Sequence, residues 1–259
     1  MRIWETAAVA FSLYSALPMP AFPWTQKNMR YALAAFPLVG AVLGLFCWGW
    51  SALCAALALP PLLRGAGLCV LPALVTGGIH LDGYCDTADA LASHAPPERK
   101  REILHDAHCG AFACIRLCIL FVLCFALCCT LNPTPAALWC LGISFVLSRA
   151  LSGAALCILP IAPGSGLAKS FADAADKRRV RLILAGTAAA CLAALFCFGG
   201  WMSFLAAAAV SVIAAYRCGR TAVREFGGIS GDLAGWFLVK EEFWLLAALT
   251  ALQLGGRGL

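Results

Sequence analysis

Long apolar stretches separated by short polar breaks dominate this chain. A helix needs about 20 apolar residues to cross a bilayer, and most of the stretches approach that length. The breaks carry helix-ending signals such as paired prolines and paired glycines. We therefore predict an all-α fold, a polytopic membrane helical bundle of about seven transmembrane helices. The expected spans are 32–59, 66–81, 110–131, 136–160, 180–198, 201–217 and 236–254.

Two stretches depart from this pattern. Residues 4–23 are apolar but contain three prolines near their end, which favours a re-entrant or interfacial N-terminal helix over a full span. The expected span 66–81 is short and interrupted at Gly77-Gly78. It is typical of a broken helix, which would deliver His80 and Asp82 below the headgroup plane.

Composition agrees with a membrane protein. Hydrophobic residues make up 62% of the chain and charged residues 12%, and the mean hydropathy is +0.86. With 259 residues, the spans leave no room for a separate soluble domain, so we treat 1–259 as one integral-membrane domain. The 15 cysteines lie mostly in apolar runs and form no CxxC pattern, which favours small core residues over disulfides or a zinc site.

The charged residues predict an orientation. Nearly all Lys and Arg fall in alternate loops, which the positive-inside rule assigns to the cytoplasm. We expect the acids on the same side, and hence an active site on the cytoplasmic face of a cell (inner) membrane. No nucleic-acid-binding module is visible, and none is expected. The four loops are 24–31, 82–109, 160–181 and 217–235.

An acidic cluster follows the broken span. Asp82, Asp86 and Asp89 recur at intervals of four and three residues. On a helix they share one stripe about 10 Å long, where they repel one another unless a cation neutralises them. This pattern predicts a Mg²⁺ site and, with it, a phosphate-bearing substrate. The alternative is that the three acids are solvated on an ordinary surface helix.

A second polar segment, 98–110, carries Glu98, Glu102 and Asp106 at helical spacing with a basic triplet between them. Alone, it is typical of a solvated amphipathic helix with internal ion pairs. Its position beside the aspartate stripe also allows Asp106 to join the metal site. The basic triplet could instead bind anionic lipid.

Several cations are candidates for substrate phosphate. Arg149 lies within the span 136–160, where an arginine must find an anion. We expect its partner to be the aspartate cluster or a substrate phosphate, with a purely structural ion pair as the alternative. The loop 163–170 could contact phosphate through backbone N–H groups and Lys169. Three arginines at helical spacing precede a glycine-rich turn: Arg217, Arg220 and Arg224. This pattern predicts an anion-binding site, and it is equally typical of a simple juxtamembrane positive cluster.

Three motifs in this order resemble the cobalamin synthase family of adenosylcobinamide-GDP ribazoletransferases. Residues 78–89 are similar to the family pattern G-x-H-x-D-G-x-x-D-T-x-D-G, and residues 102–112 to E-I-M-K-D-S-[RH]-x-G-x-[FY]-G. Residues 227–232 look like the late G-G-x-T-G-D, and the resemblance spans nearly the whole chain. Small residues replace other small residues of these patterns at Ala90, Ala107, Ala113 and Ser230.

The resemblance implies a membrane phosphotransferase of vitamin B12 nucleotide-loop assembly. In its reaction, α-ribazole or α-ribazole 5′-phosphate attacks the cobinamide-linked phosphate of adenosylcobinamide-GDP and expels GMP. The product is adenosylcobalamin or its 5′-phosphate. Expected partners are these substrates and membrane lipid, with a homo-oligomer as a further option.

Residue roles follow from the motifs and from what phosphoryl transfer requires. Mg²⁺ is assigned to the stripe together with Asp106, and His80, Asp82 and Asp106 are the catalytic candidates. On a regular helix His80 points away from the stripe, so its role as base or phosphate donor predicts a break around Gly83. The substrate-binding candidates are Arg149, Lys169, Arg220, Arg224 and Asp232.

Two other functions were weighed against this one. A CDP-alcohol phosphatidyltransferase-like enzyme would carry Ala-Arg after Asp82-Gly83, and this chain does not. An ion-coupled transporter would place carboxylates near the midplane and usually shows internal repeats. We expect neither feature here.

Overall fold

The computed structural model describes residues 3–106 and 108–256, which are almost entirely helical. Within these ranges the only β-structure is an isolated bridge between Ile161 and Ile229. The helices are α1 (Ile3–Tyr14), α2 (Gln26–Met29), α3 (Ala32–Ala56), α4 (Pro61–Thr76), α5 (Ile79–Ala92), α6 (Pro97–Ile103), α7 (Ala111–Thr130), α8 (Pro135–Ile158), α9 (Gly166–Ala174), α10 (Lys177–Phe226) and α11 (Gly231–Leu254).

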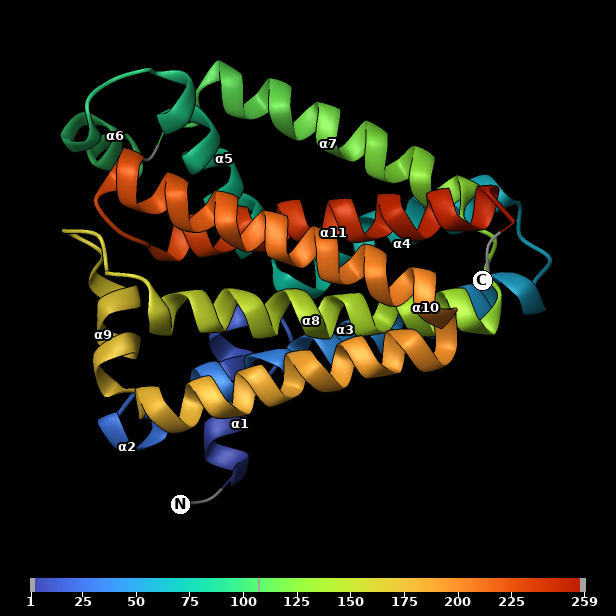
Figure 1. Cartoon of the computed structure of the whole chain (residues 1–259), viewed down its shortest axis with the longest axis horizontal. Coiled ribbons are helices and arrows are strands. Elements are labelled where there is room, and N and C mark those ends of the chain that lie inside the picture. Colours follow the sequence, from blue (N-terminus) through green and yellow to red (C-terminus); the bar gives the residue numbers. More distant parts are fainter. Residues whose placement is uncertain (1–2, 107, 257–259) are drawn as a thin grey trace.

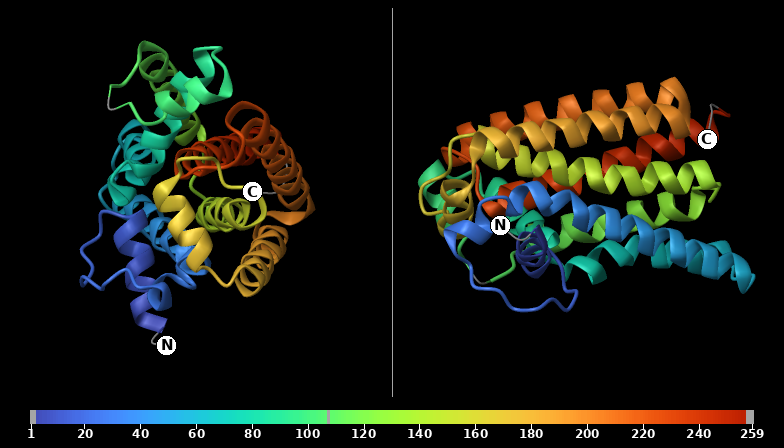
Figure 2. Two further views of the ribbon diagram at one scale, coloured as in Figure 1. Left: turned by 90° about the vertical axis from the view of Figure 1, so that its left-hand side faces the viewer. Right: turned by 90° about the horizontal axis from the view of Figure 1, so that it is seen from below.

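The long helices run side by side along the length of the molecule, with α8 at the centre (Figures 1 and 2). Helix α8 packs against α3, α10 and α11. Its contact with α3 is close because Gly40 and Gly44 face it: a Cβ at Gly40 would lie 2.3 Å from the Phe145 carbonyl oxygen. Small residues spaced four apart let two membrane helices approach in this way.

Helix α10 reverses direction at its middle. Gly200 has φ 74° and ψ −179°, which breaks an otherwise continuous helix. The two halves of α10 then run in opposite directions, one along α8 and the other toward α11 (Figure 1). The predicted break between the spans 180–198 and 201–217 is therefore confirmed.

Helices α4 and α5 form the broken span that the sequence predicts. Gly77 and Gly78 are both left-handed, with φ 65° and 79°, a conformation that only glycine adopts without strain. The two helices meet at an angle of 93°. This bend turns α5 across the bundle, so that it packs against α11 and α7.

The N-terminal helix α1 is too short to span a bilayer, with 12 residues. It packs on α3 and runs across the long helices instead of alongside them (Figures 1 and 2). An extended segment containing the three prolines follows it. This arrangement is the one that an interfacial helix requires.

Four of the described helices are long and apolar enough to cross a membrane, and five if α4 and α5 count as one bent span. These are α3, α7, α8 and α10. The expected total of seven stays a prediction. It requires counting the halves of α10 separately and adding α11, which carries four charged side chains: Asp232, Lys240, Glu241 and Glu242.

Helices α2, α6 and α9 gather at one end of the bundle, while the last turn of α11 lies at the other (Figure 1). If the first end is cytoplasmic, reporters fused after residue 95, 172 or 225 will report the cytoplasm, and reporters near 133 or 199 the outside. Alkaline phosphatase and green fluorescent protein fusions measure this directly. The same side reported at 95 and 133 would contradict the span assignment.

Candidate active site

A cavity of about 370 Å³ opens at the end of the bundle that carries α2, α6 and α9. Segments from α1, α3, α5, α8, α9 and α11 line it. Its polar wall contains the carboxylates of Asp82, Asp86 and Asp232 together with His80 and His105. The remaining wall is largely apolar, as is typical of a site for a large organic ligand.

A close crossing of α5 and α11 brings the three carboxylates together. A Cβ at Gly83 would lie 2.7 Å from the Asp232 Cα and from its carbonyl oxygen. At Gly235, a Cβ would lie 3.1 Å from the His80 carbonyl oxygen. Because neither glycine carries a side chain, the first turn of α11 sits directly on α5 beside Asp82 and Asp86.

The start of α11 is fixed by the loop before it. The Ile229 N–H donates to the Pro160 carbonyl at 2.8 Å, and the Ala162 N–H donates to the Ile229 carbonyl at 2.9 Å. Ser230 then caps α11 by accepting from the Leu233 N–H at 3.2 Å. The late glycine-rich motif therefore holds Asp232 in the first turn of α11 at the cavity wall.

Carboxylates dominate the charge on this wall. Asp82, Asp232 and Asp89 are the charged neighbours of Asp86, and among the described residues none of these four acids forms an ion pair with Lys, Arg or His. Within the same ranges, no group of three or more His, Cys, Asp or Glu side chains is arranged to hold a metal ion. The donors are nevertheless hard oxygens crowded without a counter-charge, which is the chemistry that Mg²⁺ neutralises.

Asp89 has a different environment from the other two acids of the stripe. Its oxygens accept from the Gly110 N–H at 2.6 Å and from the Ala113 N–H at 2.8 Å. It therefore caps the N-terminus of α7, and it does not line the cavity. Asp89 therefore lies outside the cavity that Asp82 and Asp86 line, although all three lie on α5 as predicted.

Asp106 also lies apart from the cavity lining. It is exposed, and it accepts a hydrogen bond of 3.0 Å from the His108 backbone N–H. That hydrogen bond holds the pKa of Asp106 below its usual range. Asp232, and not Asp106, lines the cavity together with Asp82 and Asp86.

His80 reaches the cavity by a route other than the one predicted. Helix α5 is continuous through Gly83, so the expected break there is wrong, and the bend lies at Gly77-Gly78. The His80 ring is 8% exposed and packs against Tyr14 and Phe36. Its Nε2 has no hydrogen-bond partner among the described residues.

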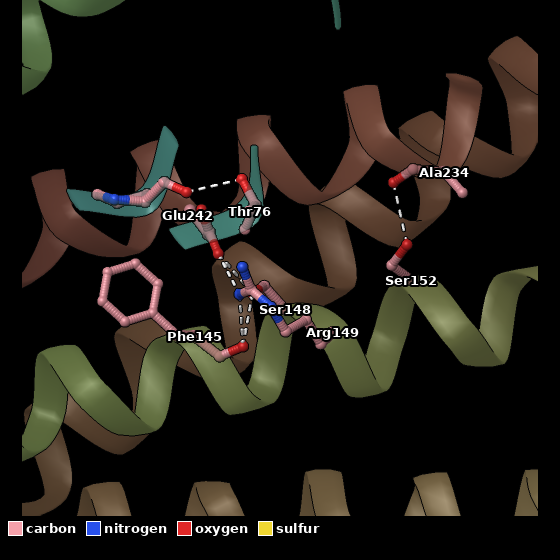
Figure 3. Close-up of polar contacts among 8 residues, drawn as sticks. Thr76, Phe145, Ser148, Arg149, Ser152, Ala234 and Glu242 are labelled. Carbon is pink, nitrogen blue, oxygen red and sulfur yellow. Dashed lines mark hydrogen bonds and ion pairs between the residues drawn. The ribbon is translucent and has the colours of Figure 1, made fainter. Parts of the chain in front are cut away.

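Arg149 is fully buried. It does not pair with the aspartate stripe, and it does not line the cavity of about 370 Å³. Its Nη1 donates to Glu242 Oε1 at 2.5 Å and to the Phe145 carbonyl at 2.9 Å (Figure 3). Ser148 donates to the same carboxylate oxygen at 3.2 Å. The expectation that every acid lies at the cytoplasmic end is wrong, because Glu241 and Glu242 lie within α11.

This ion pair borders a second, smaller cavity of about 80 Å³ lined by α4, α5, α7, α8 and α11. His80 lines both cavities, whereas Arg149 and Glu242 line only the small one. Most of the lining of the small cavity is apolar, and its other polar residues are Thr76, His80 and Ser144. The structure therefore supports the alternative of a structural ion pair that ties α8 to α11.

The other candidate cations lie outside the cavity lining. Lys169, Arg220 and Arg224 are all exposed. The backbone next to Lys169 does reach the site, because residues 165–168, at the start of α9, line the cavity. Helix N-termini present free N–H groups that suit phosphate oxygens.

The basic triplet on α6 is largely engaged within the protein. Lys100 is buried and pairs with Glu225, and Arg101 donates to the Phe226 carbonyl at 3.1 Å. Arg99 pairs with Glu102 on its own helix. Of the predicted amphipathic helix 98–110, the structure confirms the part that α6 covers, with internal ion pairs between Arg99 and Glu102 and between Arg101 and Glu98.

Sequence reasoning missed His105 as a cavity residue. It stands one position before Asp106 in the second motif, and it lines the cavity together with Asp232. The sequence signal that could have identified it is its position directly before Asp106, a candidate acid of that motif. Of the small-residue replacements, Ala90 and Ala113 are fully buried, and Ala107 lies outside the described residues.

Comparisons with known proteins agree with the motifs. The family described as cobalamin-5-phosphate synthase matches residues 6–250. An adenosylcobinamide-GDP ribazoletransferase from Lachnoclostridium phytofermentans is 37% identical over 96% of this chain and 93% of its own length. Proteins of the same name from Pseudomonas savastanoi and Clostridium perfringens are 32% and 28% identical, each over 94% of this chain and over 98% and 96% of their own lengths. No solved structure matches. The chain belongs to the cobalamin-5-phosphate synthase family.

Proposed function

We propose that this protein joins α-ribazole, or α-ribazole 5′-phosphate, to adenosylcobinamide-GDP with release of GMP. The observation that carries the proposal is the cavity in which Asp82, Asp86 and Asp232 meet. These acids come from the first and last motifs of the family resemblance, 150 residues apart in the chain, and the fold brings them to one wall. The relatives are named as adenosylcobinamide-GDP ribazoletransferases, and the release of GMP is what the resemblance to the family implies.

The transfer forms one P–O bond and breaks another. A ribose hydroxyl of α-ribazole attacks the phosphorus that carries cobinamide, the bond to the GMP oxygen breaks, and GMP leaves with the bonding electrons. The hydroxyl proton must go to a base. Negative charge accumulates on the phosphate oxygens and on the leaving group, and this charge is what the site has to stabilise.

Mg²⁺ held by Asp82, Asp86 and Asp232 would supply that stabilisation. This set replaces Asp89, which caps α7, and Asp106, which is exposed and engaged with His108. The oxygens of Asp82, Asp86 and Asp232 have no other cation partner among the described residues. Their crowding is a reason for them to bind a divalent ion.

Two histidines are candidates for proton transfer, and their environments differ. His80 is nearly buried among aromatic rings. His105 is exposed and lies beside Asp232 at the cavity wall. We assign the base to His105 and the role of a substrate-facing hydrogen-bond donor to His80.

Substrate phosphate is expected at the start of α9, where residues 165–168 line the cavity. Backbone N–H groups there can donate hydrogen bonds to phosphate oxygens without help from a side chain. The apolar wall, which includes Leu156 and Phe171, suits a bulky corrinoid. We place this site on the cytoplasmic face of the inner membrane, where the positive-inside rule puts α6 and α9.

The proposal is tested with the purified protein in detergent, supplied with adenosylcobinamide-GDP, α-ribazole and Mg²⁺. We expect equal amounts of GMP and of the joined corrinoid, and no product when EDTA removes the metal. Running α-ribazole 5′-phosphate in parallel decides between the two acceptors. Absence of GMP release with both acceptors would contradict the proposed function.

The close crossing of α5 and α11 gives a further prediction. Gly83→Ala places a methyl group 2.7 Å from the backbone at Asp232, so the two helices must separate. A displacement of about 1 Å between reacting groups lowers turnover roughly 100-fold. The matched control is Gly186→Ala on α10, because a Cβ there meets nothing within 4 Å. Equal GMP release rates for the two variants would show that the crossing does not set the site's geometry.

The two alternative functions lose support for different reasons. Carboxylates do occur within α11, so one argument against an ion-coupled transporter is removed. Glu242, however, is occupied by Arg149, and every curated relative described above is a ribazoletransferase. The same names set aside a CDP-alcohol phosphatidyltransferase.

A further inference from the structure

A groove on the lateral surface lies apart from the cavity described above. It has a volume of about 260 Å³ and runs between the second half of α10 and the start of α11. Its floor is apolar and aromatic, with Val210 and Ile213 from α10 and Trp236 and Trp244 from α11. Figure 2 shows α11 set back between α7 and this half of α10.

Two cations line this otherwise apolar groove, Arg217 on α10 and Lys240 on α11. The Lys240 Nζ lies 4.4 Å from the centre of the Trp236 ring. Within the described residues, neither Arg217 nor Lys240 forms an ion pair with a carboxylate.

Both side chains lie well inside their helices. Lys240 is nine residues into α11 and Arg217 nine residues before the end of α10, each about 14 Å along its helix. Long basic side chains at such depths extend toward the headgroups, and their charge there calls for an anion.

We infer that this groove binds the headgroup phosphate of an anionic phospholipid. Arg217 and Lys240 hold the phosphate from two helices, and an acyl chain lies along Val210, Ile213 and Trp244. Isolated intramembrane cations are unfavourable, and a bound lipid phosphate supplies the counter-charge that the protein lacks. The inference is independent of the reaction proposed for the cavity.

The test uses the full chain in a neutral detergent. Brominated phosphatidylglycerol and brominated phosphatidylcholine with the same acyl chains are titrated, and quenching of tryptophan fluorescence reports binding next to Trp236 and Trp244. We expect phosphatidylglycerol to bind more tightly. The double variant Arg217→Leu with Lys240→Leu should weaken phosphatidylglycerol binding roughly 10- to 30-fold and leave phosphatidylcholine unchanged.

The matched control is Arg178→Leu with Arg181→Leu, which removes the same charge from a different lateral pocket. It should keep the lipid preference, and thermal melting checks that both double variants are folded. If both double variants lost phosphatidylglycerol binding equally, the effect would come from net charge alone, and the inference would be overturned. The inference would also be overturned if adenosylcobinamide-GDP displaced the lipid. It would be overturned as well if the Arg217/Lys240 variant kept its lipid binding but lost a dimer that the wild-type protein forms.

Discussion

Asp82→Asn, Asp86→Asn and Asp232→Asn are each expected to lower the rate of GMP release about 100- to 1,000-fold, with the protein still folded. Each substitution keeps the side-chain volume and removes a charge from the cavity wall. The expected loss is therefore one of metal and phosphate stabilisation, not of packing. Initial rates at saturating substrate, with Mg²⁺ varied, measure it.

The control for this series is Asp173→Asn, an exposed acid of α9 at the same end of the bundle. It should retain nearly full activity. Asp106→Asn separates the sequence interpretation from the structural one, because the structure predicts a smaller loss than for Asp232→Asn. A larger loss of activity in Asp106→Asn than in Asp232→Asn would favour the ligand set predicted from the sequence, which contains Asp106, over the set that contains Asp232.

Arg149→Ala is expected to destabilise the bundle by about 3–5 kcal/mol, because it leaves the Glu242 carboxylate without a partner inside the protein. Arg149→Lys keeps the charge and should retain most of the stability and most of the turnover. This is the opposite of what a bidentate phosphate clamp would show. Thermal melting in detergent and GMP release together measure both effects.

Removing both charges provides the decisive comparison. Arg149→Met with Glu242→Leu should recover most of the stability lost in Arg149→Ala, since no buried charge is then left unpaired. Arg178→Ala, at an exposed position, should change stability by less than about 0.5 kcal/mol. A stable but inactive Arg149→Ala protein would instead show that Arg149 acts in substrate binding.

Much of the fold was accessible from the sequence because apolar length and helix breakers act locally. The expected span 110–131 corresponds to α7, and 136–160 to α8. Gly77-Gly78 and Gly199-Gly200 marked the bend and the reversal, because left-handed φ angles favour glycine. The direction in which α5 leaves that bend depends on packing against α11, which no local pattern encodes.

The site was predictable only where its residues share one helix. Asp82 and Asp86 could be placed together from helical spacing. The sequence does not show whether Asp232 or Asp106 lies beside them, because this depends on the close crossing of α5 and α11 at Gly83 and Gly235. Asp89 faces the Gly110 N–H for a similar reason, since α7 begins against it.

Arg149 shows a further limit of sequence reasoning. A buried arginine signals the need for an anion but does not identify that anion. Glu242 lies within the predicted span 236–254, where a carboxylate is itself unusual. Two opposite charges within predicted spans are therefore candidates to pair with each other.

Mn²⁺ binding followed by electron paramagnetic resonance tests most directly whether Asp82, Asp86 and Asp232 form a metal and phosphate site. We predict that the folded wild-type protein binds Mn²⁺, that adenosylcobinamide-GDP tightens this binding, and that Mg²⁺ competes for the site. Asp82→Asn and Asp232→Asn should each abolish the bound signal, while Asp173→Asn keeps it. The same Mn²⁺ affinity in wild-type, Asp82→Asn and Asp232→Asn proteins would contradict the account.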